Sequence, residues 1–241
     1  MTSPTTVLSA LRHSNAALLA GLTAEGWSDA DVRAPSLLPD WSRGHVLTHL
    51  ARNADGLSAT LAGALRGERV PRYPHGPQGR NADIETGAGR SATELLADVR
   101  SSADALDRLW DEVVRADGWQ LQCDDRTTGD YLWARWREVE IHRVDLAGRY
   151  TADQWPAEFV GYLLPVLAGS LADRAQGALR ITVTEAGSRT ADLPGTSWAV
   201  EGPGDVTELA GPDWALLAWA LGRPGAAGGT LNGMPELSRW T

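Results

Sequence analysis

The side chains in this sequence best suited to binding a metal ion are a glutamate and a histidine spaced four residues apart. Glu138 and His142 lie in the run WREVEIHRVD over residues 136–145. An α-helix has about 3.6 residues per turn, so this spacing places both side chains on one face, where they could bind a single divalent ion. Asp145 follows on the same face and could orient a ligand or accept a hydrogen bond from a bound substrate. We predict that Glu140 points away from this face and is solvated.

A pair of histidines with the same spacing occurs earlier in the chain. His45 and His49 lie near the start of another predicted helix, and a helix bundle could bring His49 to Glu138 and His142 inside its core. Two histidines, one carboxylate and an open coordination position are typical of a catalytic metal site. A glutamate and a histidine at helical spacing also form ordinary surface ion pairs, so the spacing alone leaves both interpretations open.

Apolar residues recur at helical spacing in four segments of the first two thirds of the chain. Ser42 is a suitable N-cap for the second segment, and Ser91 with Glu94 has the spacing of a capping box before the third. We expect the fourth helix to stop at Gly148, because glycine readily takes a left-handed C-cap conformation. Helices of this length predict an antiparallel four-helix bundle, with expected ranges of 5–22, 42–66, 91–116 and 131–147.

A polar segment over residues 67–89 separates the second and third of these helices. It contains Pro71, Pro74 and Pro77 together with several glycines, which favours a long loop. A loop of this length is rarely an idle connection, so we expect a functional role, with simple flexibility as the alternative.

The pattern changes in the last third of the chain. We expect a helix from Pro156 to about Gln176, kinked at Pro165 and stopped by Gly177. Alternating apolar and polar residues then predict short strands over 179–184, 197–200 and 205–209, a helix over 213–221 and a last strand at 230–231. The predicted fold class is α followed by α+β, with a four-helix bundle over residues 1–152 and a small α+β domain over residues 153–241.

Composition and charge exclude several classes of protein. Of the 241 residues, 43% are hydrophobic and 22% are charged, as in an ordinary globular protein. The net charge of −9 opposes a nucleic-acid-binding or anionic-membrane-binding surface. The sequence has no apolar run long enough to span a membrane and does not begin like a signal peptide, so we expect a cytoplasmic protein.

The basic residues and the cysteine restrict the chemistry further. All 22 basic residues are arginine, which suggests a GC-rich bacterial coding bias and excludes a Schiff-base lysine. Cys123 is the only cysteine, so the chain forms no internal disulfide and no zinc ribbon. Nothing near Cys123 in the sequence would stabilise a thiolate, and we expect an ordinary free thiol.

Two segments carry a resemblance to a known family: LLPDWSRGHVLTHL over residues 37–50 and REVEIHRVDL over residues 137–146. The chain resembles the mycothiol-dependent maleylpyruvate isomerase family, one of the DinB-like metal-binding bundles. The likeness extends over nearly the whole length, because the segments around Arg80, Arg223 and Arg239-Trp240 also have counterparts in that family. It implies a DinB-like four-helix bundle followed by a sterol-carrier-like α+β domain.

The resemblance also implies the ligands of the metal. The family's three ligands fall on His49, Glu138 and His142, and zinc is the divalent ion expected for two imidazoles and a carboxylate. His45 is then the less suitable ligand and has a role at the helix start instead.

Two arginines are implied as substrate contacts. Arg80 matches the family's loop arginine, and its guanidinium could grip a carboxylate with two charge-assisted hydrogen bonds. Arg223, just beyond a predicted helix of the second domain, is a candidate to reach across to the site. The alternatives are a surface role for Arg80 and a structural role at a helix C-terminus for Arg223.

The family reaction is the cis–trans isomerisation of maleylpyruvate to fumarylpyruvate with mycothiol, the low-molecular-weight thiol of actinobacteria. The resemblance implies that a metal-stabilised thiolate adds to the double bond of a small-molecule carboxylate, and that rotation and elimination follow. Two alternatives stay open: a mycothiol S-transferase acting on another electrophile, and a non-catalytic metal-binding module whose second domain contacts a lipid or a protein. No motif predicts a particular oligomeric state.

Overall fold

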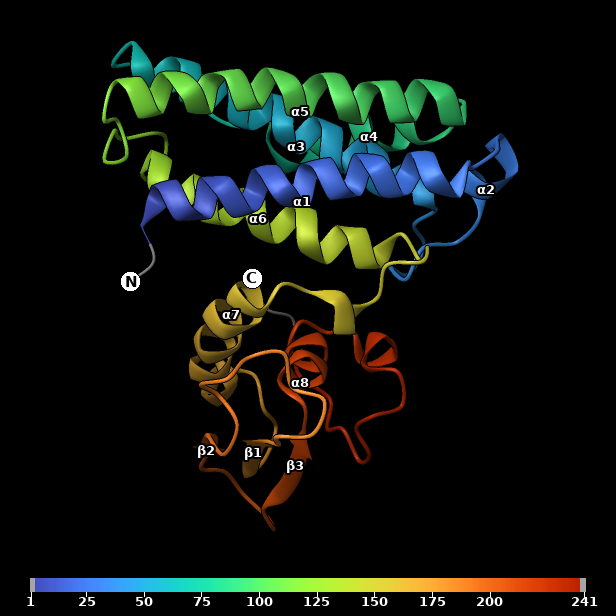
Figure 1. The fold of residues 1–241 in the computed structure, drawn as a ribbon, viewed down its shortest axis with the longest axis vertical. Helices are drawn as coiled ribbons and strands as arrows, with labels where there is room; N and C mark the ends of the chain where they lie inside the picture. Colours follow the sequence, from blue (N-terminus) through green and yellow to red (C-terminus); the bar gives the residue numbers. More distant parts are fainter. Residues whose placement is uncertain (1–2, 239–241) are drawn as a thin grey trace. The chain divides into compact units, whose positions relative to one another are not determined.

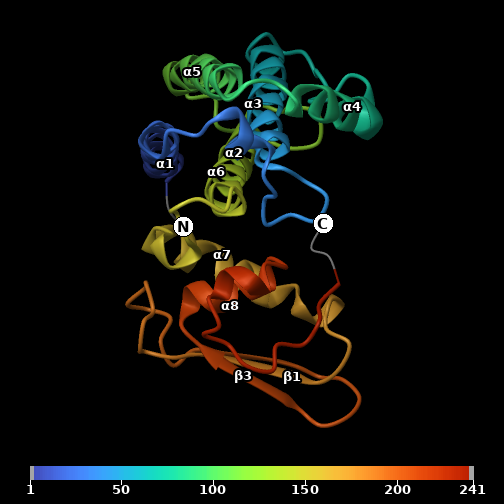
Figure 2. The same cartoon turned by 90° about the vertical axis from the view of Figure 1, so that its right-hand side faces the viewer.

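Four long helices dominate the first of the two units into which the chain divides, Met1–Arg149 and Tyr150–Thr241 (Figure 1). They are α1 (Pro4–Glu25), α3 (Arg43–Leu65), α5 (Ala92–Arg115) and α6 (Thr128–Asp145). Helices α3 and α6 contact each other, α5 packs on α3, and α1 contacts both α5 and α6. Figure 2 shows α1 and α5 nearly end-on. The computed structural model describes residues 3–238, so Arg239 and Trp240 of the family resemblance lie outside the described residues.

Capping side chains determine where the long helices begin. Ser42, Ser91 and Thr127 each close a capping box with the residue three positions later, which confirms the predicted starts of α3 and α5. The predicted stop at Gly148 is wrong, because the left-handed residue after α6 is Ala147, with a φ of 52°. A Cβ at Gly148 would displace the carboxylate of Glu25, whose Oε1 accepts a hydrogen bond from the backbone N–H of Arg149 at 3.0 Å.

Two shorter helices lie in segments that the sequence suggested were irregular. Helix α2 (Asp29–Arg33) interrupts the connection before α3, and α4 (Gly76–Ala88) occupies the end of the predicted 67–89 loop. The loop prediction is therefore wrong for residues 76–88. Only Ile84 and Ala88 of α4 are buried, so the segment lacks the apolar periodicity that identifies a helix in a sequence. Helix α4 is held by contact with α3.

The second unit combines helices with a small sheet, which confirms the predicted fold class of a helical bundle followed by an α+β domain. Helix α7 (Ala157–Gly169) continues through Pro165 but ends before the predicted Gln176. Three short 3₁₀ helices lie at Ala152–Gln154 (η1), Leu171–Asp173 (η2) and Pro224–Ala227 (η3). The strand predicted at 230–231 is not formed; Leu237 makes an isolated bridge with Ala175 instead.

The sheet has the order β2-β1-β3, formed by β1 (Leu179–Val183), β2 (Ser197–Val200) and β3 (Thr207–Gly211). Strand β1 is antiparallel to β2 and parallel to β3, with Leu179 opposite Val200 and Thr207. Helices α7 and α8 (Asp213–Ala220) pack on each other, and α8 also contacts β1 and β3. The alternate residues of β1 are buried, as its sequence pattern predicts. Among residues 3–238, no helix is both long enough and apolar enough to cross a membrane.

Candidate metal centre

The start of α3 sets the position of His49. Ser42 accepts a hydrogen bond from the backbone N–H of His45, while Nδ1 of His45 accepts one from the N–H of Ser42 at 3.1 Å. The other ring nitrogen of His45, Nε2, lies 3.2 Å from Glu85 Oε2. His45 is therefore engaged at the helix start, and His49 follows one turn later with only 3% of its surface exposed.

Helix α6 presents Glu138 and His142 to the same point as His49. His49 Nε2 donates a hydrogen bond to Glu138 Oε2 at 2.7 Å, and His142 Nε2 lies 3.2 Å from the same oxygen. The two imidazole rings meet edge to face, with centroids 4.6 Å apart. One donor atom from each of the three residues lies within 4.8 Å of the others, so the structure brings together the three side chains that the sequence singled out.

Asp145 lies beside His142, one turn further along α6. It is fully buried, and its Oδ2 accepts a hydrogen bond from His142 Nδ1 at 2.8 Å. With Nδ1 engaged by Asp145, Nε2 is the nitrogen that faces Glu138 and remains for a metal once its proton is released. Carboxylates commonly orient metal-bound histidines in this way, so Asp145 fits a supporting role.

The protonation preferences of the cluster follow from burial and charge. Burial lowers the pKa of His49 to about 4, although Glu138 opposes the shift. Burial also disfavours protonated His142, but hydrogen bonds with Asp145 and Glu138 outweigh it and raise the pKa to about 9. For Glu138, burial would raise the pKa, yet the charges and hydrogen bonds of the two histidines hold it well below its usual range. A half-buried, ionised carboxylate therefore lies between two imidazoles.

This donor set fits a divalent transition metal. Two imidazole nitrogens and one carboxylate oxygen converge, as in catalytic zinc sites with three protein ligands. Asp145 already fixes the tautomer of His142 that ligation through Nε2 requires. The chemistry of the donors, together with their spacing, is the reason to regard the triad as a metal centre.

Arg80 reaches this cluster from α4. Its Nη2 donates to His49 Nδ1 at 3.0 Å, and its Nη1 donates to Asn81 Oδ1 at 3.0 Å. Because the predicted loop is helical here, Arg80 projects from a turn of α4 and not from a flexible segment.

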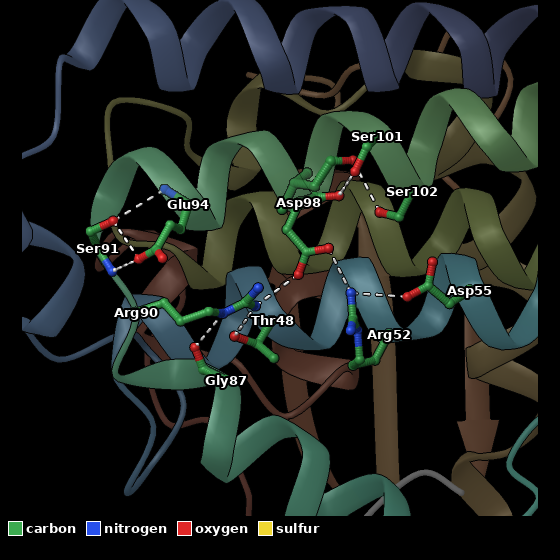
Figure 3. Close-up of polar contacts among 11 residues, drawn as sticks. Thr48, Arg52, Asp55, Gly87, Arg90, Ser91, Glu94, Asp98, Ser101 and Ser102 are labelled. Atoms are coloured by element: carbon green, nitrogen blue, oxygen red, sulfur yellow. Dashed lines mark hydrogen bonds and ion pairs between the residues drawn. The ribbon is translucent and has the colours of Figure 1, made fainter.

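An ionic network fixes the end of α4 to the bundle (Figure 3). Arg90 donates to the carbonyl of Gly87 at 2.9 Å and pairs with Asp98 of α5 at 2.7 Å. Arg52 of α3 pairs with the same Asp98 at 2.6 Å and with Asp55 at 2.9 Å. The network joins α3, α5 and the C-terminal end of α4, and so holds the helix that carries Arg80.

The solvated environment predicted for Glu140 is wrong, whereas the free thiol predicted at Cys123 is confirmed. Glu140 is not solvated: it is 1% exposed and accepts a short hydrogen bond from Ser14 of α1, which Trp136 Nε1 also contacts at 3.0 Å. Cys123 is a free thiol, as expected, but it is buried, and burial with nearby Asp125 raises its pKa to about 11. Neither residue joins the metal cluster.

Arg223 lies in the second unit, immediately after α8. Its Nη1 donates to the carbonyl of Leu221 at 2.7 Å, at the C-terminal end of that helix. This contact corresponds to the structural alternative for Arg223, and its role as a substrate contact stays a prediction.

Two side chains near the triad were not predicted as part of the site. Trp41 has its ring centroid 5.7 Å from that of His49 and 6.1 Å from that of His45. Arg135 lies one turn before Glu138 on α6, is 1% exposed, and donates from Nη1 to Leu50 O and Asn53 Oδ1, both at 2.9 Å. The spacing of Arg135 and Glu138 was the available signal, because residues three apart share a helix face.

Comparisons with known proteins give one family and two solved structures. A family model described as the mycothiol maleylpyruvate isomerase N-terminal domain matches residues 8–147. The chain is similar to a crystal structure of the mycothiol-dependent maleylpyruvate isomerase, with 25% identity, a TM-score of 0.84, and coverage of 99% of this chain and 98% of that chain. A crystal structure of a histidine-to-alanine mutant of a mycothiol-dependent maleylpyruvate isomerase matches with the same values. No curated protein matches the sequence significantly.

Proposed function

The chain belongs to the mycothiol maleylpyruvate isomerase family, and we propose that it is a metal- and mycothiol-dependent cis–trans isomerase of maleylpyruvate or a similar unsaturated keto acid. The observation that carries this proposal is the convergence of His49, Glu138 and His142, whose donor atoms lie within 4.8 Å of one another. Similarity to the isomerase over the whole chain supports the reaction type.

The three residues of the triad would hold a divalent ion, which we propose to be zinc. Such an ion lowers the pKa of a thiol and so supplies a nucleophile at neutral pH. His142 is oriented for this task by Asp145, and Glu138 contributes the negative charge that favours a cation between two neutral imidazoles. Mycothiol would supply the sulfur, whose reversible addition to a conjugated double bond permits rotation. A reduced thiol persists in the cytoplasm, where we propose that the enzyme acts.

Arginine side chains would bind the carboxylates of the substrate. Arg80 is beside the triad and forms no ion pair within residues 3–238, so its charge is available to a carboxylate and to negative charge that develops during the reaction. Arg223 is the second candidate, on the strength of the family resemblance.

The proposal is tested with purified protein loaded with zinc. Maleylpyruvate is added with and without mycothiol, and isomerisation is followed by absorbance; a generic electrophile is then supplied with the thiol. We expect isomerisation only when metal and thiol are both present. Conjugation of the electrophile without isomerisation would identify an S-transferase, and inactivity in both assays would leave a binding module.

A further inference from the structure

Some arginines of the bundle pair with nearby acids, whereas, among the described residues, Arg72, Arg80 and Arg135 do not. Ion pairs join Arg12, Arg52, Arg66, Arg90 and Arg126 to aspartate or glutamate. Within residues 3–238, Arg72, Arg80 and Arg135 have no carboxylate oxygen within 4.0 Å. Acidic residues outnumber basic ones in the chain, which has a net charge of −9. A shortage of acidic residues therefore does not explain why these three arginines have no acidic partner.

Arg72 and Arg80 both lie over one aromatic ring. The Cζ atoms of Arg72 and Arg80 lie 4.8 and 5.7 Å from the centroid of Tyr73, and Arg72 is also 5.9 Å from the ring of Tyr131. Arg135 is deeper: it is 1% exposed, and its Nε has no hydrogen-bond acceptor among the described residues. Glu138, and after it Tyr73 and Asp55, interact electrostatically with Arg135. Stacking on tyrosine stabilises each cation without neutralising its charge.

The fold itself holds Arg72 at this place. A Cβ on Gly56 of α3 would lie 2.6 Å from the carbonyl oxygen of Arg72 and 2.8 Å from its Cγ, so only glycine allows this close approach. One turn later, Thr60 donates a hydrogen bond to the carbonyl of Val70 at 3.1 Å. The segment before α4 is therefore fixed against α3, and Arg72 needs no ion pair to keep its position.

Unpaired guanidinium groups gathered at a half-buried site favour an anion from outside the chain. We infer that Arg72, stacked on Tyr73, binds the second carboxylate of a dicarboxylate ligand whose first carboxylate is bound by Arg80, while Arg135 adds positive charge from the protein interior. This inference rests on the proposed function for the contact with Arg80. It makes Arg72 a determinant of specificity for dicarboxylates over monocarboxylates.

The experiment measures binding of an unreactive diacid, so its result does not depend on isomerase activity. Pimelate is saturated and has the same number of carbon atoms as maleylpyruvate, and heptanoate is its monocarboxylate counterpart. Calorimetric titrations use zinc-loaded wild-type protein, Arg72→Gln and Arg72→Lys. Arg69→Gln is the matched control, because Arg69 is exposed and lies on the same segment.

We expect wild-type protein to prefer pimelate, and Arg72→Gln to weaken pimelate binding roughly tenfold to a hundredfold, the usual effect of losing a hydrogen bond between charged groups. Heptanoate binding should be unchanged, Arg72→Lys should recover part of the loss, and Arg69→Gln should behave as wild type. Equal weakening of both acids by Arg72→Gln, or a wild type without preference, would overturn the inference. If the diacid results hold while maleylpyruvate is not isomerised, the subsite stands and the proposed function fails.

Discussion

Arg80 and Glu138 contact opposite nitrogens of the His49 ring, Arg80 at Nδ1 over 3.0 Å and Glu138 at Nε2 over 2.7 Å. A guanidinium only donates hydrogen bonds, so His49 accepts at Nδ1 and carries its proton on Nε2. Ligation of a metal through Nε2 requires the proton on Nδ1 instead, where it would face another donor. Metal loading and the contact between Arg80 and His49 are therefore mutually exclusive, and loading frees Arg80.

The substitution Arg80→Ala should separate the two roles of this side chain. It removes a competitor for Nδ1 of His49, so zinc affinity should be unchanged or higher. Turnover of maleylpyruvate should fall by a factor that corresponds to about 2 to 5 kcal/mol, as for other lost contacts between buried charges. Competition with a zinc chelator and steady-state kinetics measure the two effects, with Arg69→Ala as control. Wild-type kinetics in Arg80→Ala would show that Arg80 takes no part in substrate binding or turnover.

Metal content should depend on the triad and not on histidine in general. We expect His49→Ala and His142→Ala to lose most of their bound metal, since each removes one of three donors. His13→Ala is the control, because His13 is exposed on α1. Elemental analysis of dialysed protein gives the metal content per chain. Full occupancy in both triad variants would refute the proposed site.

Zinc affinity should fall as the pH is lowered. In the metal-free protein the pKa of His142 is raised to about 9, so at neutral pH the ion must displace a proton from it. Affinity should therefore decrease by roughly tenfold per pH unit below about pH 9. Calorimetry in buffers of different ionisation enthalpy counts the released protons, and we expect about one at pH 7. No proton release at that pH would mean that His142 is already neutral or is not a ligand.

Asp145→Asn tests the orientation of His142. Asparagine keeps the size of the side chain but removes the charge that holds the proton on Nδ1. Zinc affinity should drop by about 10- to 100-fold, as for other partners of metal-bound histidines. Cobalt-substituted protein should also show an altered absorption spectrum. Asp104→Asn, an exposed site on α5, should leave both measurements unchanged.

The sulfur nucleophile should come from the added thiol. Cys123 is buried and its pKa is raised to about 11, so only about 0.1% is thiolate at pH 8. Cys123→Ser should isomerise maleylpyruvate at nearly the wild-type rate with mycothiol present, and native protein should react slowly with thiol reagents. Activity of the wild type without added thiol, lost in Cys123→Ser, would refute the proposed mechanism.

The elements that were predictable from the sequence are those whose signals are local. Helix α3 begins with the Ser42 capping box, and α6 carries Glu138 and His142 one turn apart, because both features depend on residues a few positions away. The prediction that His49 lies close to this pair depended on the further hypothesis that the helices form a bundle. The structure has that convergence, while metal binding itself stays a prediction.

The features that the sequence could not predict depend on distant contacts. Helix α4 has too few apolar residues to be recognised, and its position comes from α3. Glu140 was expected in solvent, yet Ser14 from α1 accommodates its carboxylate inside the bundle. Helix α3 and Ser14 are both distant in the sequence from the residues that they contact. A pattern of neighbouring residues therefore cannot predict these contacts.

The small buried surface of α4 has a kinetic consequence. With only Ile84 and Ala88 in the core, this helix should unfold locally at a much lower free energy than the rest of the bundle. Each local unfolding event moves α4, with Arg80, away from the side of the cluster formed by His49 and opens a path to the metal ligands. Exchange of the bound metal ion should therefore proceed at the rate at which α4 unfolds locally. Amide hydrogen exchange should also be faster in α4 than in α3. The protein would then replace its metal without global unfolding.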